Sequence, residues 1–176
     1  MPTPASGYGL QALVMLARAN GGGEQNIDPG FKALRDEIAP NVLAYEPSLD
    51  RLAALFVGKQ ARIVVWGSGR SHYFAEAGLP AGFVSPREGM PAMLSAACAT
   101  ARPERNERAS NFVKALLQPG LQRLFLRDFG WAPAAISAGI QPPAEVPPSA
   151  LVTLDWIEIN RQRAAWTERW KRDIDK

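Results

Sequence analysis

The sequence contains one cysteine, Cys98, and one histidine, His72. A single cysteine excludes an internal disulfide and a metal site built from several cysteines. A single histidine excludes a metal centre with a histidine pair and leaves one candidate base for a Ser-His-Asp triad. We therefore expect no metal and no cofactor, and we interpret His72 as a surface histidine on a helix.

Signals for membranes, catalysis and nucleic-acid binding are also missing. No run reaches the roughly 18 apolar residues that span a bilayer, and the N-terminal residues lack the basic region and cleavage site of a secretory signal. G-x-S-x-G and P-loop motifs are absent, and no carboxylate pair can be assigned to one pocket. The net charge of +3 is spread along the chain rather than clustered with aromatic residues. We predict neither an enzyme nor a nucleic-acid-binding protein.

What the sequence does contain is an alternation of helix and strand signals. Its 176 residues, 47% of them hydrophobic, can bury the core of one medium domain or two small ones. Periodicity and capping residues predict helices from Ser6, Asp28, Ser48, Arg70, Asn106, Pro119 and about Asp155. Strand-like runs are predicted at 41–45, 63–65, 83–84 and 90–100. This order favours an α/β layer followed by a helical region.

The stretch 62–89 has the organisation of a binding crevice. The apolar run 63–65 stops at Trp66 and the small-residue turn at 67–69, and a helix is predicted behind it, over 70–77. Such a turn lets a ligand approach the backbone, and the helix start offers free N–H groups. We therefore predict that Trp66, Gly67 and Ser68 bind a ligand.

The motifs Trp66-Gly67, Ala75 to Pro80 and Pro86 to Gly89 occur in an order and spacing that resemble one family. It is the spermidine/putrescine type of ABC-transporter solute-binding protein, with the type II periplasmic-binding fold. The resemblance extends through Phe112-Val113 to the end of the chain. It implies two lobes that close over a small solute by hinge bending, an ABC-transporter permease as partner, and a periplasmic location.

Under this resemblance the chain is the C-terminal portion of such a protein. Residues 4–92 are expected to form the α/β domain of lobe two. Residues 93–176 are expected to form the crossover strand and the helical C-terminal part of lobe one, whose N-terminal sheet portion is absent. The alternative is a ligand-sensing or oligomerisation module on the same fold, with no transport role.

The resemblance also suggests the ligand-binding residues and their ligand class. Polyamine binders hold their amines with acidic residues at the start of the first lobe-two helix and on the crossover strand. This chain has no acid at 6–9 or at 90–100, so we expect an anionic or neutral polar solute rather than a polyamine. Trp131 is either a ligand-facing aromatic or a hinge-packing residue. The predicted binding residues are Ser6, Gly7, Tyr8, Trp66, Gly67, Ser68, Met93, Ser95 and Trp131.

The last predicted helix carries an apolar stripe of Trp156, Ile159, Trp166 and Trp170. Its helical spacing favours core packing over a ligand platform. In the resembling family this segment packs against lobe one, and much of that lobe would precede Met1. We therefore expect that the stripe is covered by a second copy of the chain, or that the chain frays from about residue 100 onward.

Overall fold

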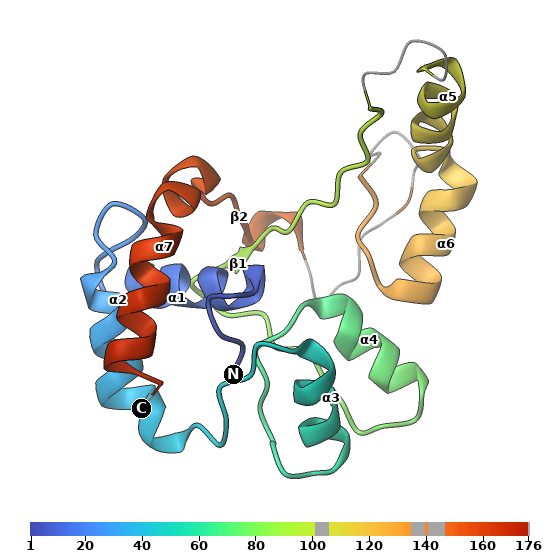
Figure 1. The fold of residues 1–176 in the computed structure, drawn as a ribbon. Helices are drawn as coiled ribbons and strands as arrows, with labels where there is room; N and C mark the ends of the chain where they lie inside the picture. The colour runs from blue at the N-terminus through green and yellow to red at the C-terminus, as the bar shows by residue number, and fades with distance from the viewer. Residues whose placement is uncertain (101–105, 135–139, 141–146, 176) are drawn as a thin grey trace. The chain divides into compact units, whose positions relative to one another are not determined.

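The computed structural model describes residues 1–100, 106–134, 140 and 147–175. The fold is mixed α/β but mostly helical (Figure 1). The chain divides into two compact units, of which unit 1 comprises Met1–Gly67 and Val152–Lys176, and unit 2 comprises Ser68–Leu151. The boundary predicted from the sequence, between residues 4–92 and 93–176, stays a prediction. Among the described helices, none is long and apolar enough to cross a membrane.

Unit 1 is built from helices whose starts the sequence marks clearly. Ser6 Oγ accepts a hydrogen bond from the Gly9 N–H at 3.2 Å, and Asp155 caps the last helix by accepting from the N–H groups of Ile157 and Glu158. Ser48 is the corresponding cap of the third helix. The elements are α1 (Gly7–Ala19), α2 (Asp28–Ala33), the π-helical turn η1 (Leu34–Ile38), the 3₁₀ turn η2 (Ala39–Asn41), α3 (Leu49–Val57) and α7 (Trp156–Asp173).

The core of unit 1 lies between α7 and the pair α1–α2 (Figure 1). Trp166 and Trp170 are buried, Trp170 to 1% exposure, and Ile159 is fully buried. These side chains pack with residues of α1, α2 and the following turn, including Leu10, Leu13, Val14, Phe31 and Leu34. Core packing of the tryptophan stripe is thereby confirmed. The expectation that a second copy covers the stripe, or else that the chain frays from about residue 100, is wrong for α7, because α1 and α2 of the same chain cover its stripe.

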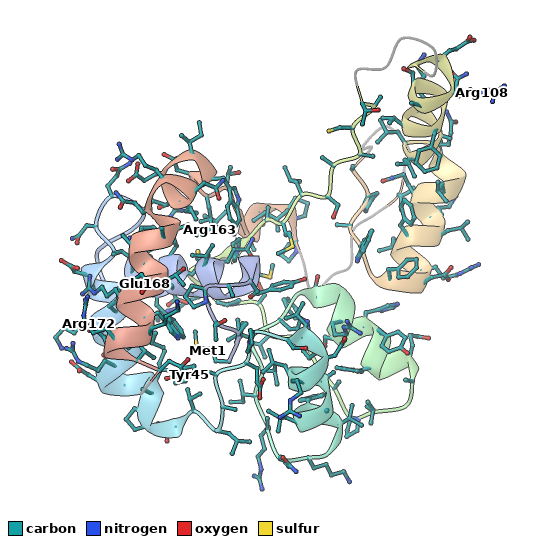
Figure 2. The ribbon with its side chains drawn as sticks, viewed as in Figure 1. Met1, Tyr45, Arg108, Arg163, Glu168 and Arg172 are labelled. Carbon is teal, nitrogen blue, oxygen red and sulfur yellow. The ribbon has the colours of Figure 1, made fainter. Side chains whose placement is uncertain are left out.

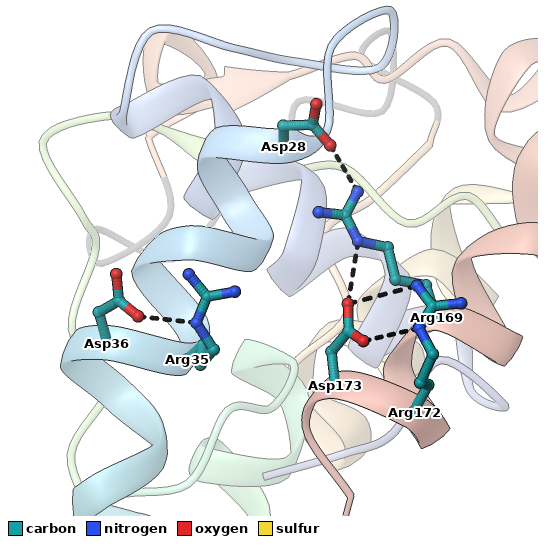
Figure 3. A network of polar contacts seen from close by, with 6 residues as sticks. All are labelled: Asp28, Arg35, Asp36, Arg169, Arg172 and Asp173. Carbon is teal, nitrogen blue, oxygen red and sulfur yellow. Dashed lines mark hydrogen bonds and ion pairs between the residues drawn. The ribbon is translucent and has the colours of Figure 1, made fainter.

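Arg169 links α7 to α2 by two kinds of contact, of which Figure 3 shows the ion pair with Asp28. Its guanidinium carbon lies 4.2 Å from the centroid of the Phe31 ring, and the guanidinium forms an ion pair with Asp28. Asp173, one turn further along α7, accepts from Arg169 Nε at 3.4 Å and from Arg172 Nε at 2.8 Å. The Arg169 guanidinium therefore covers the Phe31 ring at this edge of the apolar core.

The N-terminal residues pair with the segment that follows η2. The Glu46 N–H donates to the Met1 carbonyl at 3.0 Å, and the Thr3 N–H donates to the Glu46 carbonyl at 3.2 Å. Tyr45, which is labelled in Figure 2, meets the Trp170 ring edge-on, with ring centroids 5.4 Å apart. The strand predicted at 41–45 is therefore not formed, and one isolated parallel bridge between Pro2 and Glu46 stands in its place.

Unit 2 is a smaller set of helices with one short strand pair. Helix α6 packs against α4 and α5. Buried Gln122 of α6 ties the unit together, because its Nε2 donates to the Leu116 carbonyl and its Oε1 accepts from the Ala134 N–H, both at 2.7 Å. The elements are α4 (Ser68–Glu76), β1 (Met90–Pro91), α5 (Asn106–Leu116), α6 (Pro119–Phe129) and the 3₁₀ turn η5 (Pro148–Ala150). Strand β2 (Leu151–Val152) pairs with β1 and spans the boundary between the two units.

The remaining strand predictions are wrong for most of the residues concerned. Residues 63–65 and 83–84 form no strand, and the crossover strand predicted at 90–100 is limited to Met90–Pro91. Ile63 is 90% exposed and Val84 81% exposed, so neither run is covered by a neighbouring layer. A β-branched run becomes a strand only where a second segment pairs with it. Residues 141–148 contain four prolines, from which the sequence predicts an extended connector, and they lie mostly outside the described residues.

Replacing Trp170 tests whether α7 closes the core. Trp170→Ala should lower the free energy of unfolding of unit 1 by about 3–5 kcal/mol, because it removes a buried aromatic side chain and leaves a cavity. The measurement is urea unfolding followed by circular dichroism. The matched control on the same helix is Ile157→Ala, whose side chain is 86% exposed and whose effect should stay within about 0.5 kcal/mol. Equal effects of the two substitutions would contradict the packing of α7.

Candidate functional site

The start of α1 presents small residues and a helix N-terminus. The Ser6 hydroxyl is used within the turn, since it donates to the Thr3 carbonyl at 3.1 Å and accepts from the Gly9 N–H. Among the described residues, the Gly7 N–H has no hydrogen-bond partner. First-turn N–H groups of a helix attract anions and polar oxygen atoms. Ser6 therefore acts as a cap, and Gly7 and Tyr8 remain the candidates for ligand contact at this end.

The fold brings this helix start together with the turn after the run 63–65. The hydroxyl end of the Tyr8 ring lies against Gly67, where an added Cβ would be 2.8 Å from Tyr8 Oη. A larger residue at this position would require the Tyr8 side chain to shift. Trp66, which is half-buried, lies directly beside Gly67 in the chain. Within unit 1 the structure thus places Tyr8, Trp66 and Gly67 in one neighbourhood. The start of α1 and the Trp66-Gly67 turn, which the sequence indicated separately, are therefore in contact.

The absence of acidic residues that the sequence predicts near the start of α1 holds for the helix itself but not for the segment that pairs with the N-terminal residues. The first turn of α1 carries no acidic residue, as the sequence predicts. The backbone of Glu46 nevertheless pairs with Pro2 and Thr3, which precede Tyr8 of α1 by six and five residues. Its carboxylate lies 3.8 Å from Arg51 Nε, which offsets its charge. Sequence reasoning missed Glu46, because only backbone pairing far along the chain brings it here.

In unit 2 the start of α4 meets Trp131. A Cβ added to Gly69 would lie 2.4 Å from the Phe129 carbonyl oxygen and 3.0 Å from Trp131 Cδ1. The Trp131 ring also packs against Phe125 and Phe129, with centroids 5.8 Å and 5.4 Å away. It remains 49% exposed. Trp131 therefore has a packing role at the junction of α4 and α6. The exposed part of its ring forms an aromatic surface beside the first turn of α4, which begins at Ser68.

His72 takes part in the same junction. Its Nε2 lies 3.0 Å from the Arg127 carbonyl oxygen at the end of α6. Because a carbonyl oxygen only accepts, Nε2 carries the proton in this contact. His72 is a half-buried residue that links α4 to α6, and not simply a surface histidine. No carboxylate partner for the ring is recorded among the described residues, so the geometry is not that of a catalytic triad.

Met93 and Ser95 lie on the irregular stretch that follows β1, and both are exposed. Within the described part of the chain, no hydrogen bond or ring contact joins either residue to the other predicted binding residues. The structure therefore brings Tyr8 together with Trp66 and Gly67, and Ser68 together with Trp131.

A polar depression, which the sequence did not indicate, lies at the C-terminal end of α1. It has a volume of about 480 Å³ and is lined by Arg18, Gly21, Gly22, Gly23, Glu24, Gln25, Asn26 and Asp155. Glu24 is its buried centre. The Glu24 carboxylate accepts from Arg18 Nε at 3.0 Å and Nη2 at 2.6 Å, and from the Asp155 N–H at 2.9 Å. Arg18 and Glu24 therefore neutralise each other's charge. The hydrogen bond from the Asp155 N–H to Glu24 also holds the start of α7 near the end of α1.

The surroundings of Glu24 lower the pKa of its carboxyl group. Burial by itself raises the pKa of Glu24, but the hydrogen bonds from the Arg18 guanidinium and the Asp155 N–H outweigh it. The pKa of the folded form therefore lies below the ordinary value. The stabilisation is fully present above the pKa of the unfolded chain, and it is lost as the pH falls through the folded pKa.

Replacing Glu24 should change both the stability and its pH dependence. Glu24→Gln should lower the free energy of unfolding at pH 7 by about 1–3 kcal/mol, since Arg18 loses its charged partner. The loss of stability on acidification below about pH 4.3 should also become shallower. Denaturant unfolding at several pH values measures both effects. Glu37→Gln, at an exposed glutamate of the same unit, is the control, and a matching change in that variant would contradict the assignment.

Comparison with known proteins assigns no family. No family model, no curated protein and no solved structure matches the chain. Within the described residues, no group of three or more histidine, cysteine, aspartate or glutamate side chains could hold a metal ion.

Proposed function

We propose that this chain is the C-terminal part of a solute-binding protein of an ABC importer, with the type II periplasmic-binding fold, that captures a small polar solute. The observation that carries the proposal is the approach of Tyr8 to Gly67 within unit 1. It joins the start of α1 to the Trp66-Gly67 turn, the two segments for which the family resemblance implies ligand contact. A periplasmic location and a permease partner belong to the same proposal.

The chemistry of this neighbourhood suits an anionic or neutral polar solute. The Gly7 N–H and the other first-turn N–H groups favour a carboxylate, a phosphate or a neutral oxygen atom. Tyr8 can donate a hydrogen bond through its hydroxyl, and Trp66 offers a flat apolar wall. A polyamine would need carboxylate partners here. The first turn of α1 supplies none, and Glu46 faces Arg51.

The connectivity of the chain is consistent with this function. The chain passes between the units twice, from Gly67 to Ser68 and from Leu151 to Val152. Periplasmic binding proteins close two domains around a ligand by hinge motion.

Calorimetry with defined solutes tests the function and the ligand class. The panel is succinate, inorganic phosphate and glycerol against putrescine and spermidine, preceded by native mass spectrometry of protein purified from rich medium. We expect an anionic or neutral member to bind. Trp66→Ala should weaken that binding about tenfold, equivalent to about 1.4 kcal/mol, and Tyr8→Phe should weaken it measurably by removing only the hydroxyl.

The control is Phe112→Ala, which removes an exposed aromatic side chain of α5 and should leave binding unchanged. Submicromolar binding of spermidine would overturn the ligand class but keep the function. A folded protein that retains no small molecule and binds no member of the panel would overturn the function itself.

A further inference from the structure

Gln11, in the second turn of α1, is a buried polar side chain whose amide donor is unused. The polar or charged side chains that are buried in the described part of the chain are Gln11, Glu24, Gln122 and Glu158. Glu24 and Glu158 are bonded to arginine side chains, and Gln122 is bonded to two backbone groups. Gln11 is 4% exposed, and its Nε2 has no hydrogen-bond partner among the described residues. Because an unpaired buried donor costs free energy, the Gln11 amide indicates a role other than packing.

Two other buried polar groups of unit 1, Tyr45 Oη and Trp170 Nε1, are also unpaired within the described part of the chain. Both belong to large rings that pack edge-on against each other. The burial of such a ring is itself strongly favourable, so it offsets the cost of one unpaired polar atom. A glutamine has only a short aliphatic part and is rarely buried for its own sake. Packing therefore explains the two rings and does not explain Gln11.

The position of Gln11 in α1 places its amide over the first turn of the helix. Helix α1 comprises Gly7–Ala19, and Tyr8 precedes Gln11 by three residues on the same side of the helix. Long side chains of a helix lean towards its N-terminus and cover the turn before their own Cα. For Gln11 this is the turn of Gly7 and Tyr8, where the Gly7 N–H has no partner among the described residues. The two unused donors, Gln11 Nε2 and the Gly7 N–H, therefore lie at the same end of α1.

We propose that Gln11 binds the solute, with its Nε2 donating to one oxygen of a carboxylate group whose other oxygen accepts from the Gly7 N–H. This inference rests on the proposed function, and it narrows the ligand class from anionic or neutral polar solutes to carboxylates. Ser6, Gly7 and Tyr8 are only half-buried, so a solute reaches this turn from solvent. The amide turns towards the solute by rotation about its terminal torsion, which has a broad minimum in glutamine.

A carboxylate fits these donors better than a phosphate or an ammonium group does. Residues 6–11, Ser-Gly-Tyr-Gly-Leu-Gln, carry no charged side chain. Two neutral N–H donors match the two oxygen atoms of a singly charged carboxylate, and the helix N-terminus favours its negative charge. A doubly charged phosphate is commonly bound by arginine or lysine side chains. An ammonium group needs acceptors, whereas the two unused groups are donors.

Replacing each of the two buried glutamines by methionine tests whether the Gln11 amide is unpaired in the solute-free protein. Gln11→Met keeps a long, helix-favouring side chain and removes only the polar group, so the thermal midpoint should rise. Gln122→Met is the matched control, because Gln122 is 6% exposed and its amide makes two hydrogen bonds, whose loss should lower the midpoint. Thermal unfolding followed by circular dichroism measures both. A lowered midpoint in Gln11→Met would show that the amide is already bonded in the folded chain, and it would overturn the proposal.

Calorimetry with succinate, its neutral diamide succinamide and inorganic phosphate tests the role of Gln11 in binding. The wild-type chain should bind succinate more tightly than the other two. Gln11→Met should weaken succinate binding about tenfold or more, which is the loss expected for a hydrogen bond to a charged oxygen. Gln122→Met should leave the affinity for succinate unchanged.

The outcomes separate this inference from the proposed function. An unchanged affinity for succinate in Gln11→Met, together with weaker binding in Trp66→Ala, would overturn the inference and leave the function intact. Phosphate or succinamide that binds as tightly as succinate would overturn the carboxylate assignment in the same way. A wild-type chain that binds no solute would overturn both, and a raised midpoint in Gln11→Met would then identify the amide as a packing defect alone.

Discussion

The burial of the α7 stripe against α1 and α2 is the interaction on which unit 1 depends. Trp166, Trp170 and Ile159 are large apolar side chains, and each contributes about 1.5–3 kcal/mol when fully removed from water. Exposed ion pairs contribute at most about 1 kcal/mol each. Contacts such as Arg169 with Asp28 and Arg172 with Asp173 therefore orient α7, while the apolar face holds it in place. Glu24 adds a buried polar link to the start of the same helix.

Unit 2 is held differently. Among its described residues, Phe74 and Met90 are the buried apolar side chains, and Gln122 supplies buried hydrogen bonds between α5, α6 and the segment after Trp131. Few buried apolar contacts imply that such a region opens locally at a lower free energy than a well-packed core. We expect amide exchange to be faster in α5 and α6 than in α1 and α7 for this reason.

The sequence predicted the helices well because their signals are local. Ser6 and Ser48 act as the caps that the sequence indicated, and Pro119 begins α6. The strand predictions at 63–65 and 83–84 failed, because a strand requires a partner that composition does not specify. The type II fold remains a proposal, since the structure establishes only a mixed and mostly helical chain.

The candidate site was predictable in its parts but not in its assembly. The sequence indicated Tyr8 and the Trp66-Gly67 turn from separate patterns, and their contact depends on packing between distant segments. Glu24 carried no recognisable motif, since its partners Arg18 and Asp155 come from different parts of the chain. Only the folded chain brings such residues together.

Unit 1 is assembled from the two ends of the chain, with the whole of unit 2 between them. During synthesis, α1 and α2 leave the ribosome long before α7 exists, and their apolar faces then have no partner from this helix. At about 5–20 residues per second, the residues of unit 2 delay α7 by several seconds. Until α7 has been synthesised, the exposed apolar faces of α1 and α2 are surfaces of the kind that chaperones bind. Contacts between such distant segments also make the closing step of unit 1 slow relative to the formation of its individual helices.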